Sequence, residues 1–175
     1  MIKKIIVTII VLIVALLAFA ATRPDAFRVQ RTARINAAPD RIYANLEDFH
    51  RWTAWSPWEK MDSAMRRTHS GAPKGVGAVY EWEGNSKVGK GRMEIVKAST
   101  PTELTVKLDF LKPFEAHNFA EFTLRPVGAS TDVTWSMFGP SPFVSKVMGI
   151  FFDMDRMVGT DFENGLANLK TVAEQ

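Results

Sequence analysis

The chain has 175 residues, of which 46% are hydrophobic, and it contains no cysteine. This length and apolar content predict one globular domain with a full core, and the lack of cysteine excludes disulfides, zinc–thiolate sites and thiol nucleophiles. The formal charge is +3, but two of the 22 basic residues, Lys3 and Lys4, precede an N-terminal apolar run, which leaves 20 basic residues against 19 acidic ones. The rest of the chain is therefore close to neutral. This argues against a nucleic-acid-binding role, because phosphate binding needs a clustered excess of Lys and Arg.

The N-terminus carries an apolar segment, residues 5–21, that is interrupted only by Thr8. The segment is near the minimum length that crosses about 30 Å of hydrocarbon, and it is longer than the usual signal-peptide core of about 7–15 residues. It therefore predicts a transmembrane anchor within residues 1–23. A cleaved signal peptide is the alternative, because Ala18-Phe19-Ala20 has the form of a cleavage site.

Basic residues lie on both sides of this segment: lysines at positions 3 and 4 precede it, and arginines at 23, 28, 31 and 34 follow it. Since positive residues mark the cytoplasmic side, the two groups compete and do not decide the orientation. We expect a single-pass cell-membrane protein whose domain lies on the extracytoplasmic, periplasmic side, as for a signal anchor. A linker over residues 24–27 is short enough to keep that domain at the bilayer surface.

Residues 28–175 predict an α+β domain built on an antiparallel sheet. Most of its segments alternate apolar and polar side chains, as half-buried strands do, and short turns separate them. Two short helices, near residues 39–48 and 52–55, interrupt the series after the first strand, and Pro57 ends the second of them. No strand alternates with a crossover helix, which excludes a doubly wound α/β fold. The seven expected strands cover residues 28–36, 65–70, 78–83, 87–98, 103–110, 115–125 and 129–138.

The C-terminal region has a helical period instead. Apolar residues recur every three or four positions from Phe151 to Val172, which predicts an amphipathic helix over residues 150–173, about 36 Å long. Gly149 predicts a break before it, after a short leading helix over residues 142–148 that Ser141 caps. A curved, seven-stranded sheet wrapped on this long helix satisfies the whole pattern.

Several short motifs in residues 28–175 resemble the SRPBCC (START-like, helix-grip) superfamily, in its polyketide cyclase/dehydrase and lipid-transport branch. The resemblance implies a pocket between the sheet and the long helix that holds a hydrophobic ligand, and it transfers no catalytic residue. One departure is Asp62, which is followed by Ser63 where such families often have Asp-Pro. The motifs are Ile35-Asn36-Ala37-Ala38-Pro39, Trp55-Ser56-Pro57-Trp58, Gly75-Val-Gly77 with Tyr80-Glu-Trp82, Gly84-Asn85, Val88-Gly89-Lys-Gly91-Arg-Met93, and residues 161–169.

The polar motifs favour no particular reaction. Residues 84–91 are close to the phosphate-binding pattern G-x-x-x-x-G-K-[ST], but Gly91 replaces the hydroxyl residue and a strand follows, so a glycine-rich hairpin is the better interpretation. The histidines lack metal-ligand spacing, and we expect no metal site and no cofactor. A histidine–carboxylate pair across neighbouring strands stays open. The three histidines are His50, His69 and His117.

We expect the domain to bind a hydrophobic small molecule or lipid between the apolar face of the sheet and the C-terminal helix, driven by burial of apolar area. Two alternatives stay open. One is a polyketide cyclase or dehydratase that uses the same pocket with a polar group such as His117 or Glu121. The other is a structural or protein-interaction module at the membrane. The residues expected to line the pocket are Trp55, Trp58, Tyr80, Trp82, Met93, Phe122, Trp135, Met154, Val158 and Phe162.

Overall fold

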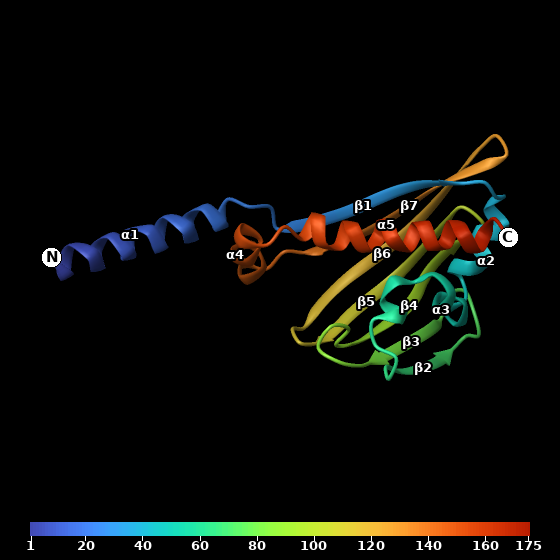
Figure 1. Cartoon of the computed structure of the whole chain (residues 1–175), viewed down its shortest axis with the longest axis horizontal. Helices are drawn as coiled ribbons and strands as arrows, with labels where there is room; N and C mark the ends of the chain where they lie inside the picture. The colour runs from blue at the N-terminus through green and yellow to red at the C-terminus, as the bar shows by residue number, and fades with distance from the viewer.

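Seven antiparallel strands form one curved sheet in the computed structural model, which describes all 175 residues (Figure 1). The strand order is β1-β7-β6-β5-β4-β3-β2, and the long C-terminal helix α5 (Met154–Ala173) lies across the sheet. The predicted helix-grip fold is confirmed. The strands are β1 (Ala26–Ile35), β2 (Arg66–Gly71), β3 (Ala78–Glu83), β4 (Lys90–Ser99), β5 (Glu103–Lys112), β6 (Ala116–Val127) and β7 (Ser130–Pro140).

The connectivity brings two distant segments of the chain together at one end of the sheet. Strands β2 to β7 pair as successive hairpins, whereas β1 pairs with the last strand, from Ala26 opposite Pro140 to Ile35 opposite Thr131. The chain enters β1 and leaves β7 at the same end. The N-terminal helix α1 (Ile2–Ala21) and the helix that follows β7, α4 (Phe143–Phe151), therefore lie beside each other there (Figure 1).

The core lies between the sheet and α5. Leu104 and Phe122 on the sheet are fully buried, and Phe162 on α5 is 1% exposed. Gly165 of α5 allows the helix to approach closely: a Cβ at this position would lie 2.7 Å from Cζ3 of Trp135. The helix thus packs its backbone directly on this indole ring, which explains a glycine in a helix interior.

The break before the long helix differs from the prediction. We expected it at Gly149, but α4 continues through Gly149 to Phe151, and the chain turns extended at Phe152. Asp153 then caps α5, because its carboxylate accepts a hydrogen bond of 2.9 Å from the backbone N–H of Arg156. An aspartate cap thus defines the start of the helix, and the glycine is tolerated in α4.

The predicted Ser141 cap is also wrong. Pro142 occupies the N-cap position of α4, and no side chain caps this end of the helix. Proline is compatible with this position because the first backbone N–H groups of a helix have no intrahelical acceptor, so the N–H that proline lacks is not needed.

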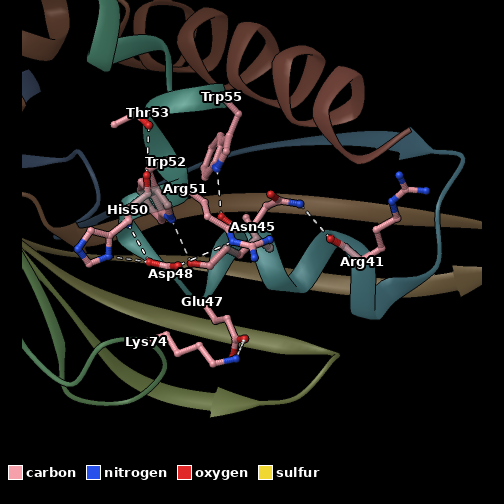
Figure 2. A network of polar contacts seen from close by, with 11 residues as sticks. Arg41, Asn45, Glu47, Asp48, His50, Arg51, Trp52, Thr53, Trp55 and Lys74 are labelled. Carbon is pink, nitrogen blue, oxygen red and sulfur yellow. Dashed lines mark hydrogen bonds and ion pairs between the residues drawn. The ribbon is translucent and has the colours of Figure 1, made fainter. Parts of the chain in front are cut away.

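Two tryptophans fasten the short helices to each other. Helix α2 (Pro39–Leu46) is followed by two 3-10 turns, η1 (Phe49–Arg51) and η2 (Pro57–Lys60), which flank α3 (Trp52–Trp55). The indole N–H of Trp55 donates to the carbonyl of Asn45 at 3.1 Å, and that of Trp52 donates to the carbonyl of Leu46 at 3.0 Å (Figure 2). Asn168 of α5 donates to the carbonyl of Trp55 at 3.1 Å. The α2–α3 segment is therefore fixed over the sheet beside α5.

Helix α1 projects from the domain (Figure 1). It is long and apolar enough to cross a membrane, a property it shares with signal sequences, and only Ala20 of its residues is buried. Its apolar side chains thus have no protein partner along most of the helix.

Candidate ligand-binding site

A cavity of about 200 Å³ lies between the sheet and α5. Strands β3 to β7 form its floor, and the segment from Trp52 to Glu59 and the first half of α5 close it from the other side. Of its 18 lining residues, 14 are hydrophobic. A concave, mostly apolar space with a few polar groups is the usual form of a small-molecule site.

Stacked aromatic rings form one wall of this cavity. Trp135 stacks on Phe162 of α5, with ring centroids 4.2 Å apart and planes only 7° from parallel. Trp58 meets the Trp135 ring edge-on at 5.6 Å. Because these rings come from β7, α5 and η2, the wall joins the sheet, the long helix and the segment from Trp52 to Glu59. It is rigid apolar surface for a ligand to rest on.

At its polar end the cavity is lined by Tyr80 and Glu59, and Arg67, outside the lining, completes a hydrogen-bonded group of three side chains. The Tyr80 hydroxyl donates to Glu59 Oε1 at 2.5 Å, and Arg67 Nε donates to Glu59 Oε2 at 2.6 Å. The Glu59 side chain is 6% exposed, and the neighbouring Arg67 supplies the opposite charge. Burial, reinforced by Glu59, raises the pKa of Tyr80, so its phenol stays protonated at neutral pH and can donate.

Asp161 is a second carboxylate at the cavity, one turn before Gly165 on α5. Burial raises its pKa, with no charged neighbour to offset the effect. This distinguishes it from Glu59, whose charge is paired with Arg67. The cavity thus has one carboxylate that is paired with a cation, Glu59, and one that has no charged partner, Asp161.

The raised pKa of Asp161 gives a pH prediction of definite sign. Because the folded state holds this proton more tightly than the unfolded state, the free energy of unfolding falls as pH rises through the titration range of the carboxyl, above its unfolded value of about 3.9. We expect Asp161→Asn to raise Tm at pH 7 and to leave it unchanged at pH 3, measured by thermal unfolding.

Asp155 on the same helix is the matched control, since the hydrogen bond from Arg31 lowers its pKa. Its stabilisation is fully present above the unfolded pKa and is lost as pH falls through the lowered folded pKa, so Asp155→Asn should lower Tm more at pH 7 than at pH 3. Equal shifts of both variants at both pH values would contradict the assignment.

The structure distributes the ten residues expected to line the pocket over three places. Trp55 and Phe122 are fully buried behind the aromatic wall, and Met154 lies in a neighbouring cavity beside α4. The role of all ten in binding stays a prediction. The other seven line the cavity: Trp58, Tyr80, Trp82, Met93, Trp135, Val158 and Phe162.

The sequence-based candidates for an acid–base group lie away from this cavity. His117 is hydrogen-bonded to Asp109 across β5 and β6 at 2.7 Å, but its side chain is 60% exposed. Glu121 pairs with Arg28 at 3.3 Å. The cross-strand histidine–carboxylate pair therefore exists on the other face of the sheet. No group of three His, Cys, Asp or Glu side chains is arranged to hold a metal ion.

Sequence reasoning missed the polar residues of the cavity. It placed Tyr80 on an apolar face and did not consider Glu59, Arg67 or Asp161. Glu59 and Arg67 belong to a 3-10 turn and an edge strand that meet only in the folded protein. The one available signal was a carboxylate directly after the Trp55-Ser56-Pro57-Trp58 motif.

Comparisons with known proteins agree with this architecture. Solved structures similar to the chain share its fold at low sequence identity. A Chromobacterium violaceum protein is 14% identical with a TM-score of 0.60, and the match covers 87% of this chain and 99% of that one. A Mesorhizobium loti protein is 17% identical with a TM-score of 0.58, covering 83% and 96%.

The di-domain ARO/CYC StfQ from the steffimycin biosynthetic pathway is 12% identical with a TM-score of 0.66, and the match covers 85% of this chain and 51% of StfQ. No curated protein matches the chain. The family described as Polyketide cyclase / dehydrase and lipid transport matches residues 26–174, which is the whole domain after α1. The chain therefore belongs to the polyketide cyclase/dehydrase and lipid transport family, within the SRPBCC superfamily, and its fold supports a ligand-binding or cyclase role.

Proposed function

We propose that this chain is a membrane-anchored protein that binds a hydrophobic small molecule or lipid between the sheet and α5. The observation that carries the proposal is the apolar cavity, with 14 hydrophobic residues among 18. Burial of apolar surface there stabilises a complex by about 25 cal/mol per Å², before ordering costs. The anchor is supported by α1, a helix of 20 residues that is long and apolar enough to cross a membrane.

The volume of the cavity limits what fits inside it. At about 200 Å³ it is smaller than the roughly 300–1,000 Å³ of typical small-molecule pockets. It suits a compact apolar molecule, or one ring or chain of a larger ligand whose remainder lies outside. A ligand of the second kind suits a protein attached to a bilayer, where such molecules partition.

The polar lining at Asp161 favours a ligand that donates a hydrogen bond, such as one with a hydroxyl. Asp161 has no charged partner, so it disfavours a negative charge beside it, and its carboxylate accepts hydrogen bonds. Lys87 is the one cation among the lining residues.

Native mass spectrometry of the full chain, purified in detergent from its own membrane, tests the proposal directly. We expect a co-purified molecule that survives gentle activation and is recovered unchanged by solvent extraction. An apo mass from every preparation, together with no uptake of the neutral probe N-phenyl-1-naphthylamine, would reject the binding role.

A cavity-filling variant places the ligand. Val158 of α5 lines the cavity, and a tryptophan in its place should occupy the space and weaken probe binding at least about tenfold, because a filled cavity must expel or overpack the ligand. Val172, on the same helix and packed against the core outside the cavity, is the matched control. Probe titration by fluorescence should separate Val158→Trp from Val172→Trp, and equal weakening would place the ligand elsewhere.

A cyclase or dehydratase is the second candidate, and the Tyr80–Glu59 pair favours it. A phenol and a carboxylate lie within hydrogen-bond reach at the end of an apolar cavity, which is a geometry suited to proton transfer. Recovery of the bound molecule in a chemically altered form, lost in Tyr80→Phe while probe affinity is retained, would support the enzyme over the binder.

A further inference from the structure

Helix α4 is mostly apolar, with Ser145 and Lys146 as its polar residues, yet none of its residues is buried. Val144 is 73% exposed, Phe151 is 65% exposed, and further exposed apolar residues follow at Phe152 and Met157. A concentration of exposed apolar side chains usually marks a surface that contacts another protein or a membrane. Nothing else in the protein covers these side chains. We call the exposed residues Phe143, Val144, Met148, Phe151, Phe152, Met154 and Met157 the α4 patch.

The single charge of α4 is withdrawn from this surface. Lys146 has an 8% exposed side chain, and its ammonium is paired with Asp25 at 2.5 Å. Asp25 belongs to the linker between α1 and β1, so the ion pair also ties α4 to the end of the N-terminal helix. The exposed surface of α4 itself therefore carries no charge, whereas the exposed Asp153, Asp155 and Arg156 stand between the patch residues at the start of α5.

The position of α4 identifies what covers it. The helix packs against α1 at the point where the chain leaves the apolar segment (Figure 1). There Arg23 lies over the Phe19 ring, 5.3 Å from its centroid, as a basic residue does at the boundary of hydrocarbon and headgroups. A bilayer crossed by α1 would meet the domain at α4.

We propose that the α4 patch is seated in the surface of the bilayer that α1 crosses, so that the domain is held in one orientation on the lipid. The proposal rests on the anchoring role proposed above for α1. The occupant is the headgroup–acyl boundary of that leaflet, the depth at which amphipathic helices bury aromatic and aliphatic side chains.

This seating gives the neighbouring cavity a role. A space of about 530 Å³ lies between the linker, α4 and the start of α5, and Arg23, Ser145 and Gly149 are among its lining residues. Phe110, Met137 and Val158 line both this space and the ligand cavity, so the two spaces adjoin at these side chains. With α4 in the leaflet, the outer space opens at the lipid, and a ligand passes between bilayer and cavity without crossing water.

Depth-dependent quenching tests the seating, because the chain has no cysteine and accepts single labels without further changes. Full-length Leu12→Cys, Val144→Cys and Val76→Cys variants, each carrying an NBD fluorophore, are reconstituted into phosphatidylcholine–phosphatidylglycerol vesicles with doxyl lipids. Val76 is the matched control, since it is 56% exposed in the turn between β2 and β3 at the opposite end of the sheet.

We expect deep quenching at position 12, shallow quenching that about halves the fluorescence at position 144, and none at position 76. Quenching at position 12 without quenching at 144 overturns the seating and leaves the anchor intact. No quenching at position 12 overturns the anchor itself. The label at 144 could instead be shielded equally in lipid-free detergent while the protein has the mass of a dimer. A second copy would then cover the α4 patch, and the proposal would be overturned.

Transfer kinetics test the lipid-side entrance. A Val144→Asp/Met148→Asp variant should slow exchange of N-phenyl-1-naphthylamine between vesicles and protein about tenfold, because charges at these positions oppose insertion. The affinity for the probe in detergent should be unchanged, and Val76→Asp should exchange at the native rate. Unchanged exchange in the double variant would overturn the entrance.

Discussion

Replacing Trp135 with alanine is expected to lower the free energy of unfolding by about 3–5 kcal/mol, the range found when a buried tryptophan is truncated. Trp135 is 2% exposed and joins three parts of the fold. Its ring stacks on Phe162 at 4.2 Å and on Phe122 at 4.9 Å, and it receives the edge of Trp55 at 5.4 Å. Alanine leaves these rings without a partner beside an existing cavity, so the void is hard to close.

Urea unfolding of the domain, followed by circular dichroism, gives the measurement. Trp58→Ala is the control, because Trp58 contacts the same ring from a partly buried position at the rim of the cavity. We expect its cost to be clearly smaller. If both variants lose the same stability, the central position of Trp135 in the core is contradicted.

Replacing Arg67 with methionine is expected to cost about 2–3 kcal/mol. The change leaves the Glu59 carboxylate, 6% exposed, without its cation. Removing one partner of a fully buried pair costs about 3–5 kcal/mol, and the lower figure here reflects the 26% exposure of Arg67, which lets water screen the pair. The loss should appear in urea unfolding at pH 7.

A double-mutant cycle isolates this interaction. Arg67→Met combined with Glu59→Gln should recover part of the stability lost in Arg67→Met alone, since the uncompensated charge is then gone. Arg34→Met is the surface control: Arg34 is 58% exposed and pairs with Asp132 at 2.7 Å, and we expect a cost below about 1 kcal/mol. Additive effects of Arg67→Met and Glu59→Gln would show that the pair is not coupled.

The sheet was predictable because each strand alternates apolar and polar side chains. The segment Leu104, Val106, Leu108 places every second side chain on one face, and neighbouring hairpins repeat this pattern, so the number of strands follows from local information. The pairing of β1 with β7 joins distant segments and does not. The start of α5 was not predictable in the same way. A glycine at position 149 and an aspartate at 153 are both plausible boundaries, and the apolar residues between them do not separate the two.

The periodicity of the sequence also does not show which side chains on one face of the sheet reach the cavity. Phe122 and Trp135 lie on adjacent strands and face the same side, directly opposite each other in the register, yet only Trp135 reaches the cavity. The difference depends on sheet curvature and on where α5 crosses, which are properties of the whole fold. Glu59, Arg67 and Tyr80 come from three elements. They become neighbours only when the curved sheet packs against the segment from Trp52 to Glu59.

The pairing of β1 with β7 sets how the protein responds to mechanical force. The linker from α1 reaches β1 at Ala26. All ten residues of β1 then pair with β7 in register. A pull on the anchor along the strand therefore loads this ladder in shear, because the inter-strand hydrogen bonds lie across the direction of force and share it. A peeling geometry would break them one at a time. With α1 as the membrane anchor proposed above, lateral drag on that helix would load the β1–β7 ladder in shear.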